Sequence, residues 1–227
     1  MTVNYKIYEF PRFPIEKQVF YASGLAIDGG YTIGGARVMS NEPGGFGILD
    51  IQPAFQVNEF EKPETSWLMS KINGQILRVR LAPTPQIANA QMARNGFKGV
   101  PWDTELLWSN NQKWDGDTDL VFVSAANAGT SEVKIDCSTL GKIFSRGHLI
   151  GHEFSTYMID EIDYDGMIAT IILTLPLRNH VGVNDKARLR PFFTGTITNG
   201  SDIVETYDAS LNGIIQMPKI TMTETII

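Results

Sequence analysis

Two histidines and a glutamate lie close together in the segment HLIGHE, at His148, His152 and Glu153. Histidines four residues apart share one face of an α-helix and could bind zinc there. The residue order differs from the HExxH zinc motif, and glycines at positions 147 and 151 favour a strand and a turn over a helix. The sequence therefore predicts no metal site here, and we interpret both histidines as surface or packing residues.

Two acidic runs resemble the first half of a calcium-binding loop. They are Asp115, Asp117 and Asp119 in one case, and Glu161, Asp163 and Asp165 followed by Gly166 in the other. An EF-hand loop also needs a bidentate glutamate at its twelfth position. That position is Ala126 in the first run and Ile172 in the second. A weak cation site at the first run stays open beside a solvated loop, and the second run is expected to point into solvent from a strand.

The sequence offers no activated nucleophile. Cys137 is the only cysteine, and it alternates with Val133 and Ile135 on the apolar side of a predicted strand. A thiol in apolar surroundings has a raised pKa and is inert. No GxSxG motif occurs, and the glycine pairs lack the Lys-Ser/Thr of a phosphate-binding loop. We therefore expect no enzyme, no catalytic residue and no cofactor.

Three tryptophans, Trp102, Trp108 and Trp114, lie among polar residues in a stretch with little periodicity, residues 82–119. A long irregular excursion inside a compact domain is usually functional or contact-forming. Tryptophan is enriched in interface cores and also stacks on sugar rings. The three side chains therefore have three possible roles: the core of their own domain, a subunit interface, or a glycan or other ligand site.

The composition predicts an all-β, mainly antiparallel fold. Apolar residues make up 43% of the 227 residues, and 21 glycines and 11 prolines divide the chain into many short elements. The net charge of −6 provides no basic surface for gripping nucleic acid. The N-terminus is not typical of a signal peptide, and no apolar run is long enough to span a bilayer. We therefore expect a soluble protein made in the cytoplasm.

We predict three regions. Residues 1–119 form an N-terminal β-sandwich-like domain, with one short helix near 62–72 and the irregular excursion 82–119. Residues 120–200 form a small β-barrel-like or sandwich domain, and residues 201–227 supply one or more C-terminal strands. The last residues, 219–227, are a β-branched run that would be an exposed edge strand unless it pairs with the N-terminal domain or a neighbouring subunit.

Local patterns place several elements within these regions. A helix with Trp67, Leu68 and Ile72 on one face precedes a strand in which Arg78 and Arg80 take the wetter side. Asp165-Gly166 between two apolar runs predicts a β-hairpin over 156–175. If these two residues form its loop, the residues expected on the buried face are Met158, Asp160, Ile162, Tyr164, Met167, Ala169, Ile171 and Leu173. A further strand is predicted over 187–193.

Several stretches together resemble the distal tail proteins of tailed bacteriophages. GGFGILDIQPAF (44–55) and KINGQILRVRLAP (71–83) are similar to the N-terminal domain of that family. SAANAGTSEVKIDC (124–137), SRGHLIGHEFSTYMI (145–159) and DGMIATIILTLPLRNHVGVNDKARLRP (165–191) follow a pattern of tail-tip proteins. Asn184-Asp185 replaces the usual Gly-Asp turn, and asparagine also tolerates positive φ.

The resemblance implies a structural virion protein of the phage tail tip, assembled in the host cytoplasm. Subunits of the family, typically six, form a ring at the distal end of the tail tube and link the tube to baseplate hub or tail-fibre proteins. DNA would pass through the lumen of this homo-oligomer, a hexamer in the usual case, without specific binding. Two alternatives remain: a carbohydrate-binding β-sandwich module for host-surface recognition, and a tail-tube subunit.

Overall fold

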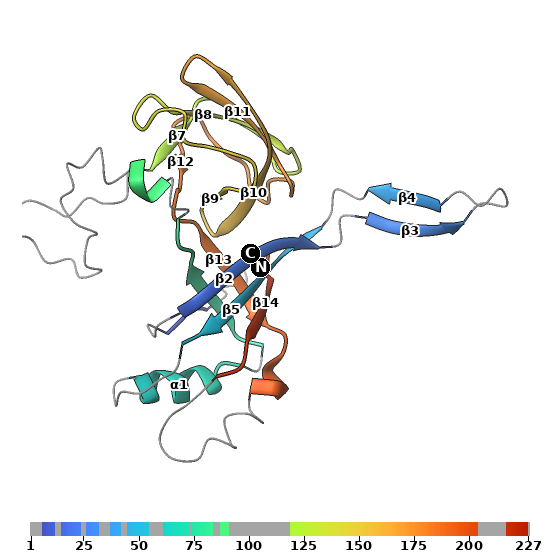
Figure 1. The fold of residues 1–227 in the computed structure, drawn as a ribbon, viewed down its shortest axis with the longest axis vertical. Coiled ribbons are helices and arrows are strands. Elements are labelled where there is room, and N and C mark those ends of the chain that lie inside the picture. The colour runs from blue at the N-terminus through green and yellow to red at the C-terminus, as the bar shows by residue number, and fades with distance from the viewer. Residues whose placement is uncertain are drawn as a thin grey trace, which may run out of the picture. The chain divides into compact units, whose positions relative to one another are not determined.

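The computed structural model describes residues 6–11, 15–23, 26–31, 37–41, 45–54, 61–72, 74–83, 87–90, 119–203 and 217–226. In these residues the chain forms two six-stranded sheets and one two-stranded sheet (Figure 1). Every strand pair within them is antiparallel except that of β1 with β6, so the predicted all-β, mainly antiparallel fold is confirmed. The chain divides into two compact units, residues 1–81 with 192–227 and residues 82–191.

The first unit is built on a six-stranded sheet whose neighbours are far apart in sequence. Its strands, in spatial order, are β1 (Ile7–Glu9), β6 (Ile76–Arg80), β13 (Phe192–Ile197), β14 (Ile220–Glu224), β5 (Phe46–Pro53) and β2 (Ile15–Ser23). Alternate residues are buried, because successive side chains of a strand point to opposite faces. The buried set includes Leu49, Ile51, Leu77, Val79, Phe193, Ile197, Ile220 and Met222.

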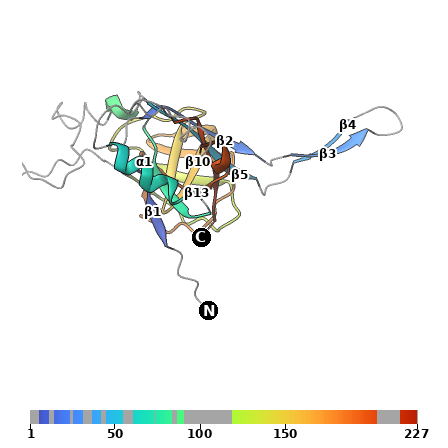
Figure 2. The same ribbon diagram turned by 90° about the horizontal axis from the view of Figure 1, so that it is seen from below.

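Helix α1 (Glu61–Met69) follows β5 and precedes β6 in the chain. Leu68 and Ile72 are buried, whereas Trp67 is half-buried and meets the ring of Tyr8 edge-on, with 6.1 Å between centroids. Figure 2 shows α1 beside β1, which carries Tyr8. Gly74, at a φ of +75°, follows the helix and turns the chain into β6.

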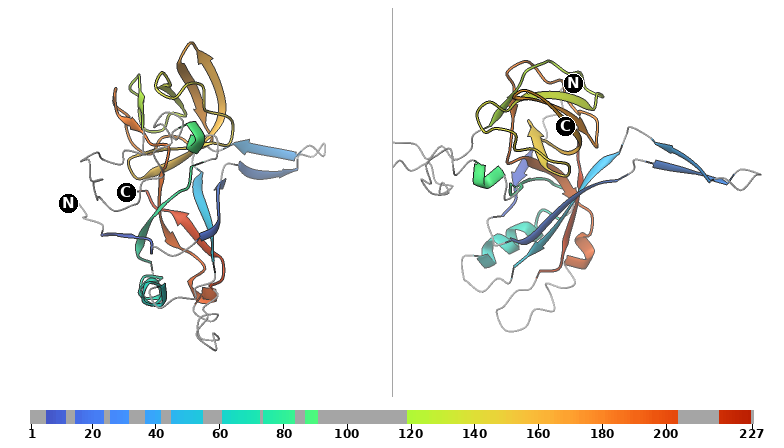
Figure 3. Two further views of the ribbon diagram at one scale, coloured as in Figure 1. Left: turned by 60° about the vertical axis from the view of Figure 1, so that its left-hand side comes forward. Right: turned by 45° about the horizontal axis from the view of Figure 1, so that its top comes forward.

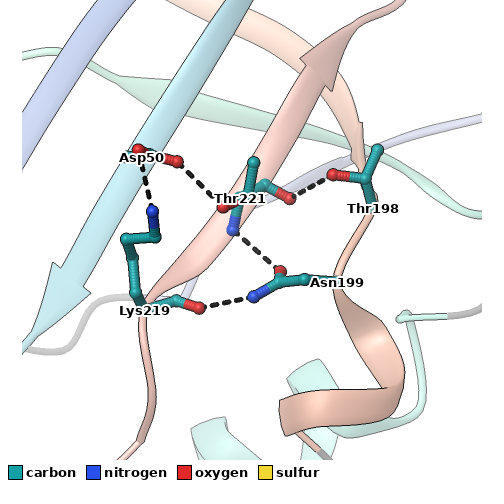
Figure 4. A network of polar contacts seen from close by, with 5 residues as sticks. All are labelled: Asp50, Thr198, Asn199, Lys219 and Thr221. Atoms are coloured by element: carbon teal, nitrogen blue, oxygen red, sulfur yellow. Dashed lines mark hydrogen bonds and ion pairs between the residues drawn. The ribbon is translucent and has the colours of Figure 1, made fainter.

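The C-terminal strand is an interior strand of the first sheet. The sequence left open whether this run pairs within its own chain or with a neighbour; in the structure β14 lies between β13 and β5, antiparallel to both. Figure 4 shows the polar contacts that hold its start: Asn199 donates to the Lys219 carbonyl (2.6 Å) and accepts from the Thr221 amide (2.8 Å). Asp50 of β5 accepts from Lys219 and from Thr221. An edge position for 220–224 is therefore ruled out within this chain.

Strands β3 (Ala26–Tyr31) and β4 (Arg37–Asn41) pair with each other in a two-stranded sheet of their own. They follow β2 and precede β5 in the chain, and Figures 1 and 3 show them as a separate ribbon. The register shifts between Asp28 and Tyr31, which marks a bulge in the ladder. In the described part of the chain neither strand has a second hydrogen-bonded neighbour, so both outer edges of this ribbon are open.

The second unit is a six-stranded sheet that curls until its ends meet. Its strands, in spatial order, are β12 (Lys186–Ala187), β7 (Leu120–Phe122), β8 (Glu132–Asp136), β11 (Ile168–Leu173), β10 (Ser155–Asp165) and β9 (Leu149–His152). Gly151 and Arg188 exchange two backbone hydrogen bonds, of 2.9 and 2.8 Å, and so join the two ends. The interior is filled by Leu120, Phe122, Val133, Ile135, Ile150, Tyr157, Ile159, Ala169, Ile171 and Leu173. This sheet is therefore close to a barrel.

The β10–β11 hairpin departs from the expected register in two ways. Its loop is Gly166-Met167, one residue later than expected, because Asp165 pairs with Ile168. A bulge between Ile159 and Glu161 then reverses the side-chain alternation. Ile159 is buried, Asp160 is exposed and Met167 is 51% exposed, so the expectation that Met158, Asp160 and Met167 lie on the buried face was wrong. Because of the bulge, the Asp160 carboxylate does not point into the barrel, where it would be buried without a compensating partner.

The strand predicted over 187–193 is two strands. Lys186–Ala187 pairs with β7 in the barrel, and Phe192–Ile197 pairs with β6 and β14 in the first sheet. Pro191 separates them, and a proline has no N–H to offer a ladder. The chain thus leaves the second unit and re-enters the first at this proline.

Candidate functional site

A set of polar contacts lies where the two ends of the barrel join. His152 Nε2 is 3.3 Å from Asp185 Oδ2, and the same carboxylate oxygen accepts from the Gly182 amide at 2.6 Å. The ring of Phe122 meets His152 edge-on at 5.7 Å. The Gly182 amide, followed by His152, holds the pKa of Asp185 below its usual value. These contacts secure the turn that carries Asn184, whose φ is +68° as its type allows.

The two histidines of the HLIGHE segment are both buried. His148 is 7% exposed and His152 is 4% exposed, so both are packing residues. Burial lowers the pKa of His148, whose Nδ1 accepts from the Ser145 amide at 3.2 Å. Glu153, in the turn between β9 and β10, accepts instead from Asn179. Among the described residues no group of three His, Cys, Asp or Glu side chains is arranged to hold a metal ion.

The single thiol has no catalytic surroundings. Cys137 is fully buried, and burial followed by the charge of Asp136 raises its pKa to about 11. A thiol with that pKa is almost wholly protonated near neutral pH, so it is a poor nucleophile. The pattern of apolar alternation had placed it correctly, because Val133 and Ile135 are buried on the same face.

The three tryptophans singled out in the sequence, Trp102, Trp108 and Trp114, lie outside the described residues, and so do Asp115 and Asp117. Their proposed roles stay predictions. Asp119, the last residue of the first acidic run, is described and lies 3.9 Å from the Lys186 ammonium.

The barrel carries a surface that combines acidic and apolar side chains, which we call the acidic–apolar face. Its residues are Glu132, Lys134 and Asp136 of β8, Glu161, Asp163 and Asp165 of β10, Ile168 of β11, and Met167 in the hairpin loop. Cross-strand pairs place the strand residues of this set on one side of the sheet, because Ile168 pairs with both Asp165 and Asp136 and Thr170 pairs with both Asp163 and Lys134. The face therefore carries five carboxylates and one ammonium group, that of Lys134. Met167 and Ile168 are 51% and 40% exposed, which is high for large apolar side chains.

The first unit carries a surface of the opposite charge, which we call the aromatic–lysine cluster: Lys6, Tyr8, Trp67 and Lys71. The Lys71 ammonium lies 4.6 Å from the centroid of the Tyr8 ring and 5.8 Å from that of Trp67. The Lys6 ammonium lies 5.0 Å from the Tyr8 centroid. Among the described residues neither lysine forms an ion pair with a carboxylate. Sequence reasoning missed this cluster because β1 and α1 are distant in the chain.

The first sheet also exposes two different edges. In the described residues β1 is the outermost strand at one edge and β2 at the other. On β2 and its neighbour β5, the apolar side chains of Val19, Tyr21 and Phe46 are each 38–39% exposed. An edge strand with exposed apolar side chains is a natural template for a further strand or subunit.

Searches against protein-family models and against curated protein sequences find no match to this chain. Among the described residues, no helix combines the length and the apolar character required to cross a membrane.

Proposed function

We propose that this protein is a structural subunit of a bacteriophage tail tip, which assembles into a ring at the distal end of the tail tube and joins the tube to baseplate hub or tail-fibre proteins. The family resemblance in the sequence suggests this role. The observation that carries it in the structure is that, among the described residues, two unlike strands, β1 and β2, are the outermost strands of a single sheet.

Unlike edges favour a ring over a two-fold dimer. β1 has three residues and pairs in parallel with β6, whereas β2 has nine and pairs antiparallel with β5. An interface between two different surfaces of the same chain is heterologous, and it closes into a ring when the rotation between copies allows. Each copy would then cover the apolar edge of the next.

The β3–β4 ribbon supports the same conclusion. A two-stranded ribbon is marginally stable in water on its own, and its open edges invite further pairing. In the described residues these two strands gain hydrogen-bonded neighbours only from each other. Contact with neighbouring copies would supply the missing partners.

The charge of the chain is compatible with a conduit for DNA. DNA binding requires phosphate neutralisation by lysine and arginine, and this chain has 25 acidic against 19 basic residues. An acidic lumen would let DNA slide without adhering. A solved ring with a lumen lined by basic side chains would contradict this part of the proposal.

Size-exclusion chromatography with light scattering, followed by negative-stain imaging of the purified full chain, tests the proposal. We expect a discrete ring with a central channel. A stable monomer at high concentration would contradict the proposal, and open tubes would favour the tail-tube alternative. Glycan binding by a monomer that is lost in Trp102→Ala or Trp108→Ala would favour the carbohydrate-binding alternative.

A further inference from the structure

We propose that the aromatic–lysine cluster of one copy docks on the acidic–apolar face of a second copy of this chain. The contact joins the first unit of one molecule to the second unit of the next. It deepens the proposed function and rests on it, because it assigns one of the surfaces through which copies would associate.

The acidic–apolar face has the composition of an interface. Protein interfaces place apolar side chains at their centre and polar or charged side chains at their rim. Here Met167 and Ile168 are exposed at the hairpin that ends β10, and Ile168 is flanked across the ladder by Asp165 and Asp136. Lys134 is the one basic residue among the five carboxylates of this face, which therefore stays acidic. Along this part of β10 only Glu161 has a described basic neighbour in an ion pair, Arg146 at 3.8 Å, and both side chains are largely exposed.

The aromatic–lysine cluster has complementary chemistry. Tyrosine and tryptophan contribute large, rigid apolar area to interfaces, and here both rings are half-buried. The two lysines are held above these rings, so ordering their side chains on binding costs less entropy than ordering free ones. Aromatic area would meet Met167 and Ile168, and the ammonium groups would meet the carboxylates.

Charge complementarity points to a second copy as the occupant. With a net charge of −6, most approaches between two copies are repulsive, so an attractive approach needs a local cationic surface facing a local acidic one. The cluster and the face supply that pair within one chain. Because the two surfaces differ, the contact is head-to-tail and leaves one of each free for the next copy.

Paired charge reversals test the contact. The variant Lys6→Glu/Lys71→Glu makes the cluster acidic, and Asp163→Lys/Asp165→Lys makes the face basic. We expect each variant alone to weaken self-association, measured by sedimentation equilibrium, by about tenfold or more. An equimolar mixture of the two should regain it, because each like pair repels and each unlike pair attracts. The four changes in one chain should regain it as well.

The matched control is Lys186→Glu, which reverses a lysine that is 72% exposed on β12 and belongs to neither surface. We expect it to associate as the unchanged protein does. Circular dichroism melting of each variant separates loss of contact from loss of fold. Carbodiimide cross-linking of mixed ¹⁴N and ¹⁵N copies should join Lys71 to Asp163 or Asp165 across the isotopes.

The outcomes separate this inference from the proposed function. If the charge reversals leave intact rings, or if the cross-links join residues only within one copy, the contact is disproved and the ring proposal stands. If the reversals behave as expected but the particles are open fibres, the contact stands and the ring proposal fails. An unchanged chain that stays monomeric and yields no cross-link between copies overturns both.

Discussion

The imidazole of His152 and the carboxylate of Asp185 meet at 3.3 Å, although 33 positions separate them in the chain. One side chain belongs to β9 and the other to the turn before β12, and the backbone bridge between Gly151 and Arg188 lies next to them. The contact between these two side chains therefore forms at the place where the two ends of the barrel join.

Asp185→Ala is expected to lower the melting temperature of the second unit, because it removes the acceptor for both the Gly182 amide and His152. Asp185→Asn keeps an acceptor for the amide and should lower it less. The pKa of Asp185 is lowered in the folded state from its ordinary value of 3.8. The charge therefore stabilises fully above that value, and this stabilisation is lost as pH falls through the lowered pKa. Melting curves of both variants at pH 7 and pH 3 check this, and equal losses at both pH values would contradict it.

Acidification is expected to destabilise the barrel through His148. Burial lowers its folded-state pKa below the ordinary value of 6.5, so as pH falls the unfolded chain takes up a proton before the folded one. Stability is thus unaffected by this group well above pH 6.5 and decreases below it. His148→Asn should flatten the dependence of the melting temperature between pH 7 and pH 5. The control is His180→Asn, at an exposed histidine, and an equal flattening there would refute the assignment.

Gly151→Ala is expected to destabilise the second unit by about 1–3 kcal/mol, the usual range for overpacking. A Cβ at this position would lie 2.7 Å from Pro191 Cβ and 2.9 Å from its Cα, and the backbone atom cannot move aside easily. Gly166→Asn is the matched control, because its φ is +61° and a Cβ there meets nothing within 4 Å. Urea unfolding compares the two, and a neutral Gly151→Ala would show that the barrel ends are loosely joined.

Asn199→Ala is expected to destabilise the first unit by about 1–3 kcal/mol, since it leaves the Thr221 amide and the Lys219 carbonyl without the partner that Asn199 provides (Figure 4). Thr198→Ala serves as the control. Its hydroxyl donates to the Thr221 carbonyl, but the Thr198 amide donates to the same oxygen and would remain. Hydrogen exchange at β14 amides should rise strongly in the first variant and little in the second. If hydrogen exchange at the β14 amides rose equally in both variants, Asn199 would contribute no more than the Thr198 hydroxyl to holding β14 in the sheet.

Much of the local structure was predictable because it depends on neighbours in the sequence. Alternating apolar residues placed Leu77 and Val79, and Val133 and Ile135, on the buried faces of their strands. The Asp165-Gly166 pair indicated a hairpin, although the loop formed one residue later. The bulge at Asp160 was not visible in the sequence, because it follows from the need to keep a carboxylate out of a barrel whose closure is not local.

The sequence by itself determined the all-β class and the buried thiol of Cys137, since both follow from residue type and short-range spacing. Only the tertiary structure decided that β14 is an interior strand, that β12 and β13 belong to different sheets, and that His152 meets Asp185. It also brought Tyr8 to Trp67, and it placed Ile168 across the ladder from Asp136 of β8 and Asp165 of β10. Strand order and surface composition depend on how the whole chain buries its apolar area, and many orders satisfy the same local pattern.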